Sequence, residues 1–469
     1  MTHTARLPLW FLVANMLVVL GAFALGLRLA RRSPLPEPQA TAMRAVFQTV
    51  LDSYIDRLDP NELGDRAIAA VAKLDDYSEY VPPSEIGHFD EQSTGTYEGI
   101  GANTVHLGDP PRAYIWVPLQ DGPADRAGLQ PGDRIDAIDG APADDLERLT
   151  ERLRGPAGST VAIDVARAGE PLHFTLERAS VTRSSVKWAQ RLGADGDLGY
   201  VYLSDFHPGC ADDLERAIQG LLQAPLRGLV LDLRFDGGGN FDECLDIARM
   251  FLREGTIVTL RRRGDEVVER YEADPARCAF PDLPLVLLMN RHSASASEVL
   301  AGALQDHDRA AVVGVPTYGK GHVNSVFQWK GLDIRLKLTT ASYYTPNGRS
   351  LDRGRHRRER QAANGHADGP TNGPTNGPAG GDAEGGIHPD LEVALDAERS
   401  ARVQAALAEL EVPAQHRDAV RAFAAAHELR PPGIEPPERD PQLAAALALL
   451  AERAAAPATP GDGVGEGGK

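Results

Sequence analysis

The stretch "LVLLMNRHSASASEVLAGALQDHDRAAVVGV", residues 285–315, has the clearest pattern in this chain of 469 residues. It begins and ends with short continuous apolar runs, which are typical of strands buried on both faces of a parallel sheet. Between these runs, "SASASEVLAGALQD" has serines on alternate positions and then apolar residues at helical spacing. A strand, a helix and a second strand in this order predict an α/β sheet with covering helices.

The same alternation continues on both sides of this stretch, over residues 199–344. "GLVLDLRF" predicts another buried strand, "FDECLDIARMFLREG" a helix, and "DIRLKLTTASYY" an antiparallel strand. Short β-type runs with turn signals fill residues 96–179, with one short helix closed by Gly128, so a separate β-rich module is expected there. Helical spacing between Met43 and Ala72 predicts two short amphipathic helices.

An uncharged segment, Leu7–Leu27, is long enough to span a bilayer as a helix. We expect an uncleaved anchor, although "AFA" at 22–24 also fits a signal-peptide cleavage site. Arginines 28, 31 and 32 follow the span and only Arg6 precedes it, which by itself would leave the body of the protein in the cytoplasm. The topology is therefore left open by the segment alone.

The composition excludes some classes of partner and cofactor. There are 67 acidic and 49 basic residues, a net charge of −18, and the basic residues form no long block, so no nucleic-acid partner is expected. Cys210, Cys244 and Cys278 show no CxxC pattern, so neither a metal site nor a disulfide framework is indicated. We expect buried thiols, with one bridged pair as the alternative in an oxidising compartment.

Low complexity marks residues 353–385, which contain the tandem "GPTNGPTNGPAGG". Such a segment buries too little apolar area to offset its ordering entropy, so a disordered insertion is predicted. Ala-rich helical segments follow it, at about 398–430 and 441–456.

Ser295 is the candidate nucleophile, because it opens a helix whose free N–H groups favour a developing oxyanion. Asp306 lies eleven residues further on, roughly 16 Å along a helix at 1.5 Å per residue, so neither it nor His307 reaches the serine. His292 is near in sequence, but no acidic residue adjoins it to orient its ring.

A lysine remains as the candidate base. Lys320 stands between two glycines in "PTYGKGHV", at the carboxyl end of the next strand of the same sheet, from which it can face Ser295. As a base it needs a pKa lowered by burial. An exposed loop lysine without a catalytic role is the alternative.

The second loop of interest is "RFDGGGNF", Arg234–Phe241, here called the glycine loop. Its three glycines lie between a buried strand and a helix, where they permit close backbone approach and can supply an oxyanion-hole amide. It lacks the G-x-G-x-x-G order and the P-loop lysine, so a nucleotide site is not supported.

These residues together resemble a known family. Three segments look like the C-terminal processing peptidases, also called tail-specific proteases. They are the run from "SASASE" to "PTYGKGHV", the segment "LVLDLRFDGGGN" and the segment "LTTASYYTPNGRSLD". "YEGIGA", "GPADRAGLQPGD" and "LRGPAGS" resemble the internal PDZ domain of that family, and "LDDYSEYVPP" is similar to the loop ahead of it. The resemblance covers about residues 43–351 and 386–396.

The resemblance implies a ClpP/crotonase-like α/β protease core with an inserted PDZ domain and no cofactor. It assigns Ser295 as nucleophile, Lys320 as general base, the amides of Gly238 and Ala296 as the oxyanion hole, and Asp306 as structural support. Asn324 stands where the family often has a glutamine that orients the lysine, and it reaches one methylene less far. Gly237, preceded by Asp236, replaces the proline usual in the glycine loop.

The PDZ resemblance implies how a substrate is selected. A PDZ domain adds an extended peptide to a sheet edge and binds its terminal carboxylate with backbone amides. Those amides would lie near Gly99, Ile100 and Gly101, the strand "NTVHL" would be the edge, and apolar C-terminal tails are the expected ligands. A plain turn between two strands is the alternative for this loop.

The expected protein is thus a membrane-anchored serine endopeptidase that acts on protein tails. The family resemblance implies a body on the periplasmic side of a bacterial inner membrane, against the arginine distribution; a homo-oligomer or an activating adaptor is left open. The alternatives are a weakly active or inactive PDZ adaptor or chaperone, and a crotonase-like acyl-CoA enzyme. The expected domains are an anchor 1–32, a linker 33–42, a helical segment 43–95, the PDZ domain 96–180, the protease core 181–352, the insertion 353–385, a return segment 386–397 and a helical C-terminal region 398–469.

Overall fold

The computed structural model of the chain describes residues 37–53, 59–193, 195–262, 265–329, 332–354, 385–409, 412–427, 429 and 439–455. It divides into two units, one up to Lys73 and one from Leu74 onward. The described part of the first unit consists of helices α2 (Glu37–Ser53) and α3 (Pro60–Ala72). Two helices were predicted from Met43 onward, and α2 begins earlier, at Glu37, within the predicted linker 33–42. Asp59 caps α3, since its side chain accepts hydrogen bonds from two amides of the first turn.

One sheet of the second unit has six strands in the order β10-β11-β12-β15-β16-β19. From β11 to β19 neighbouring strands are parallel, whereas β10 pairs antiparallel with β11. The strands are β10 (Val186–Leu192), β11 (Leu198–Leu203), β12 (Gly228–Asp232), β15 (Leu285–Met289), β16 (Ala310–Gly314) and β19 (Leu391–Glu392). The predicted parallel α/β sheet is therefore present.

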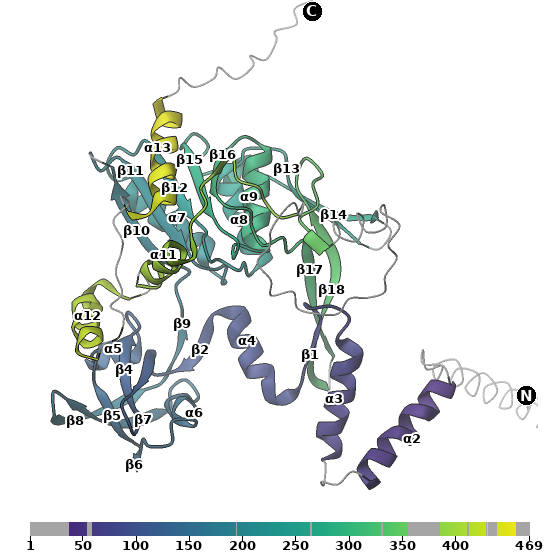
Figure 1. Cartoon of the computed structure of the whole chain (residues 1–469), viewed down its shortest axis with the longest axis vertical. Helices are drawn as coiled ribbons and strands as arrows, with labels where there is room; N and C mark the ends of the chain where they lie inside the picture. The colour runs from purple at the N-terminus through teal and green to yellow at the C-terminus, as the bar shows by residue number, and fades with distance from the viewer. Residues whose placement is uncertain are drawn as a thin grey trace, which may run out of the picture. The chain divides into compact units, whose positions relative to one another are not determined.

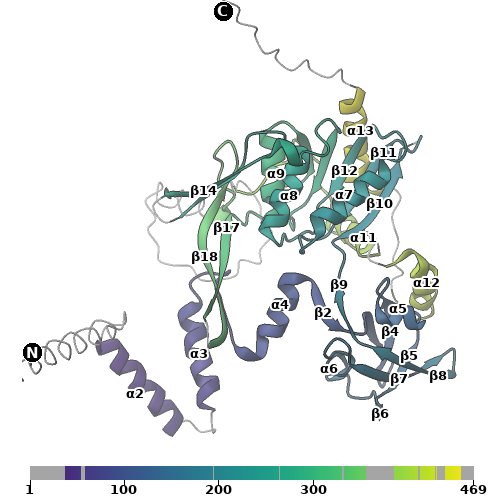
Figure 2. The same ribbon diagram turned by 180° about the vertical axis from the view of Figure 1, so that it is seen from behind.

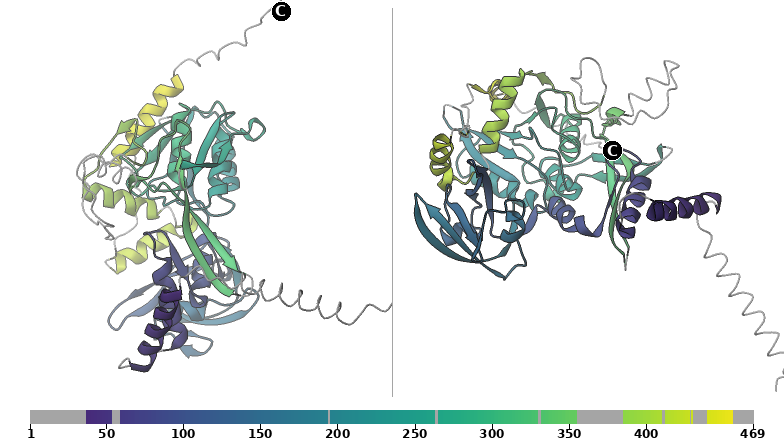
Figure 3. Two further views of the ribbon diagram at one scale, coloured as in Figure 1. Left: turned by 90° about the vertical axis from the view of Figure 1, so that its right-hand side faces the viewer. Right: turned by 60° about the horizontal axis from the view of Figure 1, so that its bottom comes forward.

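Helices cover both faces of this sheet, which explains why its central strands are continuous apolar runs. One face packs against α7 (Cys210–Leu221), α8 (Phe241–Phe251) and α9 (Ala296–Asp306). The other packs against α11 (Ala397–Glu409) and α13 (Pro441–Ala455). Helix α13 lies in front of the strands in Figure 1 and behind them in Figure 2, where α7, α8 and α9 face the viewer. In the left view of Figure 3 the yellow C-terminal helices lie on one side of the teal core.

A second, antiparallel sheet has the order β1-β18-β13-β14, with β17 paired to β18. Its strands are β1 (Glu79–Val81), β13 (Thr256–Arg261), β14 (Val267–Glu272), β17 (His322–Trp329) and β18 (Leu332–Tyr344). Strand β1 falls in "LDDYSEYVPP", which the sequence analysis treated as a loop. Three residues are too few to show a period, so only the partner strand β18 reveals it.

The β-rich module is a sheet in the order β3-β4-β5-β7-β8, with β6 paired to β5. Its strands are β3 (Ala102–Leu107), β4 (Arg112–Pro118), β5 (Arg134–Ile138), β6 (Ala141–Pro142), β7 (Thr160–Arg167) and β8 (Glu170–Glu177). It also contains α5 (Pro123–Ala127), which Gly128 ends in a left-handed conformation as predicted, and α6 (Leu149–Leu153). A short ribbon of β2 (Thr96–Gly99) and β9 (Ala179–Thr182) flanks the module, and α4 (Ile86–Thr94) precedes it.

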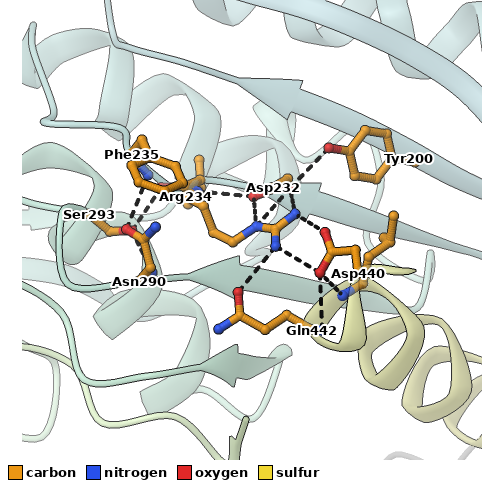
Figure 4. A network of polar contacts seen from close by, with 10 residues as sticks. Tyr200, Asp232, Arg234, Phe235, Asn290, Ser293, Asp440 and Gln442 are labelled. Atoms are coloured by element: carbon orange, nitrogen blue, oxygen red, sulfur yellow. Dashed lines mark hydrogen bonds and ion pairs between the residues drawn. The ribbon is translucent and has the colours of Figure 1, made fainter. Parts of the chain in front are cut away.

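A buried ionic network joins the carboxyl end of β12 to α13 (Figure 4). Arg234 is 1% exposed, and its guanidinium group binds the carboxylates of Asp232 and Asp440 and the side-chain oxygen of Gln442. The Tyr200 hydroxyl donates to Asp232 at 2.9 Å. The first residue of the glycine loop is thus fixed by a helix more than two hundred residues away in sequence.

Some expectations fall on parts of the chain that are not described. The predicted anchor lies outside the described residues, as does the insertion apart from its ends. Among the described residues, no helix is long and apolar enough to cross a membrane. All three cysteines are free; two are buried and Cys278 is partly buried, so no bridged pair is present.

Candidate active site

Ser295 lies at the tight turn that leads from β15 into α9. Its backbone has φ 58° and ψ −115°, a positive-φ conformation that residues other than glycine rarely adopt. Such strain costs about 1–3 kcal/mol and persists where the surroundings fix it. Ser295 is partly exposed whereas its neighbours Ala294 and Ala296 are buried, so this turn presents the candidate nucleophile at the surface of the core.

The two flanking serines fasten the glycine loop to this turn. The Ser293 hydroxyl donates to the Leu233 carbonyl at 2.8 Å, and the Ser297 hydroxyl donates to the Asp236 carbonyl at 3.0 Å. Both are fully buried. The two serines therefore shape the start of the helix by holding the neighbouring loop.

Gly238 makes the closest approach of the glycine loop to Ser295. A Cβ atom at Gly238 would lie 2.8 Å from the Ala296 nitrogen and 2.9 Å from the Ser295 Cβ, and its φ is +93°. Only glycine fits there. The structure thus brings Gly238 and Ala296, the two predicted oxyanion-hole residues, into contact beside Ser295. The Gly238 N–H, however, donates to the Asp236 carboxyl group at 2.8 Å.

Glu298 connects the candidate nucleophile with the candidate base. One carboxyl oxygen accepts from the backbone amides of Ser295 at 2.8 Å and Lys320 at 2.9 Å. The other accepts from the Gly319 amide at 2.6 Å and the Thr317 hydroxyl at 2.5 Å. The side chain is fully buried, and burial raises the pKa of Glu298 although these donors oppose the shift. One carboxyl group therefore binds two segments that are 25 residues apart.

Lys320 is partly buried beside the ring of Tyr77. Its Nζ lies 5.2 Å from the ring centroid, a cation–π geometry. Burial lowers the pKa of Lys320, the charge of Lys337 adds to this, and Glu298 and Glu79 oppose it. A lowered pKa increases the neutral fraction that a base requires. Among the contacts of the described residues, Ser295 and Lys320 are joined through Glu298 and not by a direct hydrogen bond.

The other predicted site residues lie further from the chemistry. The Asn324 amide donates to the Tyr77 carbonyl at 3.3 Å and to the Thr339 hydroxyl at 3.2 Å, so its bonds among the described residues orient Tyr77's segment and not Lys320 directly. Asp306, at the far end of α9, accepts from the Asn347 amide and pairs with Arg349, which agrees with structural support.

Both nearby histidines have structural contacts. The His292 ring stacks on Phe235 with centroids 5.3 Å apart, and His307 Nε2 lies 2.8 Å from the Thr256 carbonyl oxygen. These positions agree with their exclusion as bases.

The loop predicted to bind a peptide's terminal carboxylate, at Gly99, Ile100 and Gly101, connects β2 to β3. The Ile100 carbonyl accepts from the Ala124 amide at 2.8 Å, and Ile100 is 3% exposed. Because a trans peptide unit points its N–H opposite to its C=O, the Gly101 N–H faces away from α5. Among the strands that the structure describes, β3 is at the edge of its sheet and has β4 as its neighbour. The loop and edge have the arrangement that peptide addition needs.

Comparisons with known proteins agree with these observations. A family model described as Peptidase family S41 matches residues 197–356, and one described as PDZ domain matches residues 117–167. A carboxy-terminal-processing protease of Bartonella bacilliformis is 33% identical over 315 residues, covering 65% of this chain and 71% of the relative. The chain belongs to peptidase family S41. The predicted family of C-terminal processing peptidases with a PDZ domain is confirmed.

Two further relatives complete the comparison with the S41 family. A carboxyl-terminal-processing protease of Synechocystis is 36% identical over 283 residues, covering 59% of this chain and 65% of the relative. A solved photosystem II D1 C-terminal processing protease is 26% identical, with a TM-score of 0.39, covering 75% of this chain and 87% of that one. Membership in the family of serine-type peptidases rests on the sequence similarity.

Two residues of the site were missed by the sequence analysis. Glu298 follows Ser295 by three positions, the spacing of a capping box, which is a usable signal for a helix start. That its carboxyl group also binds residues 317–320 could not be seen from spacing. Tyr77 lies 243 positions before Lys320, and nothing local in its sequence relates the two.

Proposed function

We propose that the chain hydrolyses peptide bonds with a Ser295–Lys320 dyad through an acyl-enzyme. The observation that carries this proposal is the Glu298 carboxyl group, which binds the backbone amides of both residues. The strained turn at Ser295 and the close approach of Gly238 support it further. Buried, hydrogen-bonded supports of this kind preorganise a site before substrate arrives.

The chemistry follows from these positions. Neutral Lys320 takes the proton of the Ser295 hydroxyl while its oxygen bonds to the scissile carbonyl carbon. The carbonyl oxygen gains negative charge, which the amides of Ala296 and Gly238 would bind. Protonated Lys320 then gives its proton to the leaving amine as the C–N bond breaks, which leaves an ester on Ser295. Lys320 next takes a proton from water while the water oxygen bonds to the ester carbon, and it returns that proton to the Ser295 oxygen as the C–O bond breaks. No metal ion or cofactor takes part in this scheme.

The PDZ domain is proposed to select substrates by their C-terminal tails. An apolar tail would pair with the free edge of β3, and its carboxylate would bind amides near Gly99, Ile100 and Gly101. The buried Ile100 and the outward Gly101 amide support this assignment. Partners beyond protein substrates, whether a second copy or an activating adaptor, stay open.

We further propose a ClpP/crotonase-like core bounded at about residues 181–352, with the PDZ domain at 96–180 and a single-pass anchor before residue 33. The body would lie on the periplasmic side of a bacterial inner membrane. Protease treatment of intact cells and of spheroplasts tests this topology. Digestion of the body in spheroplasts is expected, and digestion only after lysis would contradict it.

A weakly active PDZ adaptor is the second candidate. It is favoured by two observations: the Gly238 amide is bound by Asp236, and Asn324 donates to Tyr77's segment. The acyl-CoA enzyme has no such support.

One experiment separates these functions. An unstructured protein with an apolar tail is incubated with the wild type and with Ser295→Ala, beside a copy whose last residues are aspartate. Cleavage of the apolar-tailed copy by the wild type alone is expected. Binding of the tail without Ser295-dependent cleavage would favour the adaptor.

A further inference from the structure

Asp236 occupies a particular place in the glycine loop. Its backbone carbonyl accepts from the Ala294 amide at 2.9 Å and from the Ser297 hydroxyl at 3.0 Å, which lie on either side of Ser295. Its Oδ1 accepts from the Gly238 amide at 2.8 Å. Asp236 thereby holds the candidate oxyanion-hole amide and the turn of the nucleophile in one arrangement.

The second carboxyl oxygen of Asp236 is unusual. Oδ2 is buried and has no hydrogen-bond partner among the residues that the structure describes. The whole residue has 0% exposure, and within the described part of the chain no cation pairs with it. An ionised carboxylate without a compensating charge is very costly in such a position, so the neutral acid is favoured.

The charged group that acts on Asp236 from the neighbouring elements is a second carboxylate, Asp205. Asp205, in the segment before α7, has its pKa lowered to about 2; burial opposes this shift, and hydrogen bonds from His207, Ser185 and Ser204 outweigh it. Asp205 is therefore a negative charge, with His207 Nδ1 2.8 Å away. Burial raises the pKa of Asp236 well above its usual range, and Asp205 adds to that shift. Hydrogen bonds from the Gly238 amide and the Ser297 hydroxyl oppose this rise in pKa without cancelling it. The other titratable groups that face it are the buried thiols Cys210 on α7 and Cys244 on α8, whose pKa values burial also raises.

We propose that Asp236 is a positioning residue that acts in its protonated form, so that ionisation of its carboxyl group at high pH switches peptide hydrolysis off. The inference rests on the proposed Ser295–Lys320 mechanism. A carboxylate here would place negative charge beside the oxygen that becomes negative in the transition state. It would also bind the Gly238 amide more strongly than a neutral acid does, and so withhold it from that oxygen.

The ionisations of Lys320 and Asp236 then change the activity in opposite directions as pH rises. Lys320 must lose its proton to act as a base, which raises activity as pH rises. Asp236 must keep its proton, which lowers activity at higher pH. Asparagine keeps the shape and the Oδ1 acceptor but cannot ionise, so Asp236→Asn separates the two effects.

The test is kcat/KM for a tailed substrate as a function of pH. The wild type is expected to fall about tenfold per pH unit beyond its optimum, as a single ionisation requires. Asp236→Asn is expected to rise with the wild type and then stay level. Asp242→Asn, on the exposed start of α8, is the matched control and should keep the wild-type profile. A falling limb with the same midpoint in Asp236→Asn overturns the proposal.

A second measurement does not depend on proteolysis. Because the folded pKa of Asp236 is raised, the wild type should lose unfolding free energy relative to Asp236→Asn as pH rises from the unfolded value of about 4 to the folded pKa. A pH-independent difference contradicts the protonated form even if the proposed hydrolysis fails. Asp236→Ala removes the acceptor and should lower kcat about ten- to hundredfold at and below the pH optimum of the wild type. Wild-type kcat in this variant would refute the positioning role.

Discussion

At the scale of single residues, Glu298 has the largest structural role in the site. Its carboxyl group accepts four hydrogen bonds and is the described link between the nucleophile and the base. A buried donor left without an acceptor costs about 1–3 kcal/mol. The site therefore depends on one carboxyl group that acts through the backbone amides of Ser295 and Lys320.

Glu298→Ala removes all four bonds. We expect a loss of at least about 3 kcal/mol in the free energy of unfolding, because several buried donors lose their acceptor. Hydrolysis should fall at least tenfold, since Ser295 and Lys320 lose their common support. Urea denaturation and tail cleavage measure the two effects. Glu254→Ala, at an exposed loop position, is the control. Wild-type stability in Glu298→Ala would refute this role.

Lys320 gives the site its expected pH dependence. Its pKa is lowered from 10.5, mainly by burial, so the neutral base forms at lower pH than for a free lysine. Activity should rise with pH through that lowered pKa. Lys337→Ala removes a neighbouring positive charge, so it should raise the pKa of Lys320 and move the rising limb to higher pH. A limb that stays in place, or moves to lower pH, contradicts the assignment.

The sequence predicted the candidate reacting residues better than the residues that hold them in place. Ser295, Lys320 and Gly238 stand in local patterns, and the helix argument removed His307. Tyr77 and the carboxyl contacts of Glu298 come from segments distant in sequence, where no period or spacing relates the partners. Asn324 was expected to orient Lys320, and whether its side chain reaches that lysine depends on distances that the sequence does not contain.

At the scale of elements, α13 completes the core through Arg234. Asp440, the residue before this helix, binds the guanidinium group at 2.8 Å, and Leu443, Ala446 and Leu450 of the helix cover the sheet. Because Arg234 begins the glycine loop, the C-terminal helix also stabilises the candidate oxyanion hole.

Asp440→Ala leaves a buried arginine with one carboxylate. We expect a loss of about 3–5 kcal/mol in the free energy of unfolding, the usual cost of breaking a buried ion pair from one side. The Asp418 side chain on α12 (Arg417–Ala426) is fully exposed, so Asp418→Ala should cost less than about 1 kcal/mol. Equal effects in chemical denaturation would contradict the buried network.

The elements themselves follow from the sequence where their periods are long. Strands β12, β15 and β16 are continuous apolar runs, and α8 and α9 have clear helical spacing. Strands β1 and β19 have three and two residues, and their pairing with β18 and β16 decides them. Strands this short are determined by their pairing in the folded protein and leave no recognisable pattern in the local sequence.

At the scale of the molecule, the segment around α12 contacts both the PDZ domain and the protease core. Phe423 packs on Tyr114 and Trp116 of β4, and His416 Nε2 lies 2.8 Å from Asp125. At the start of the same helix, the Arg417 guanidinium lies 3.7 Å from the ring centroid of Trp188 in β10. The sequence predicted a helix here but gave no sign of its partners.

Phe423→Ala should loosen this contact. We expect faster amide hydrogen exchange in α12 and β4, because the aromatic packing between them is lost, with no change in β12 or β15. Phe327→Ala, in an exposed position of β17, is the control. Unchanged exchange in α12 would show that Phe423 does not hold it.

The central claim is that Ser295 is the nucleophile and Lys320 its base. The most direct measurement compares kcat/KM for an apolar-tailed substrate among the wild type, Ser295→Ala and Lys320→Ala, with folding checked by circular dichroism. Both folded variants are predicted to lose at least about a thousandfold. Lys320→Ala with near wild-type activity would contradict the account.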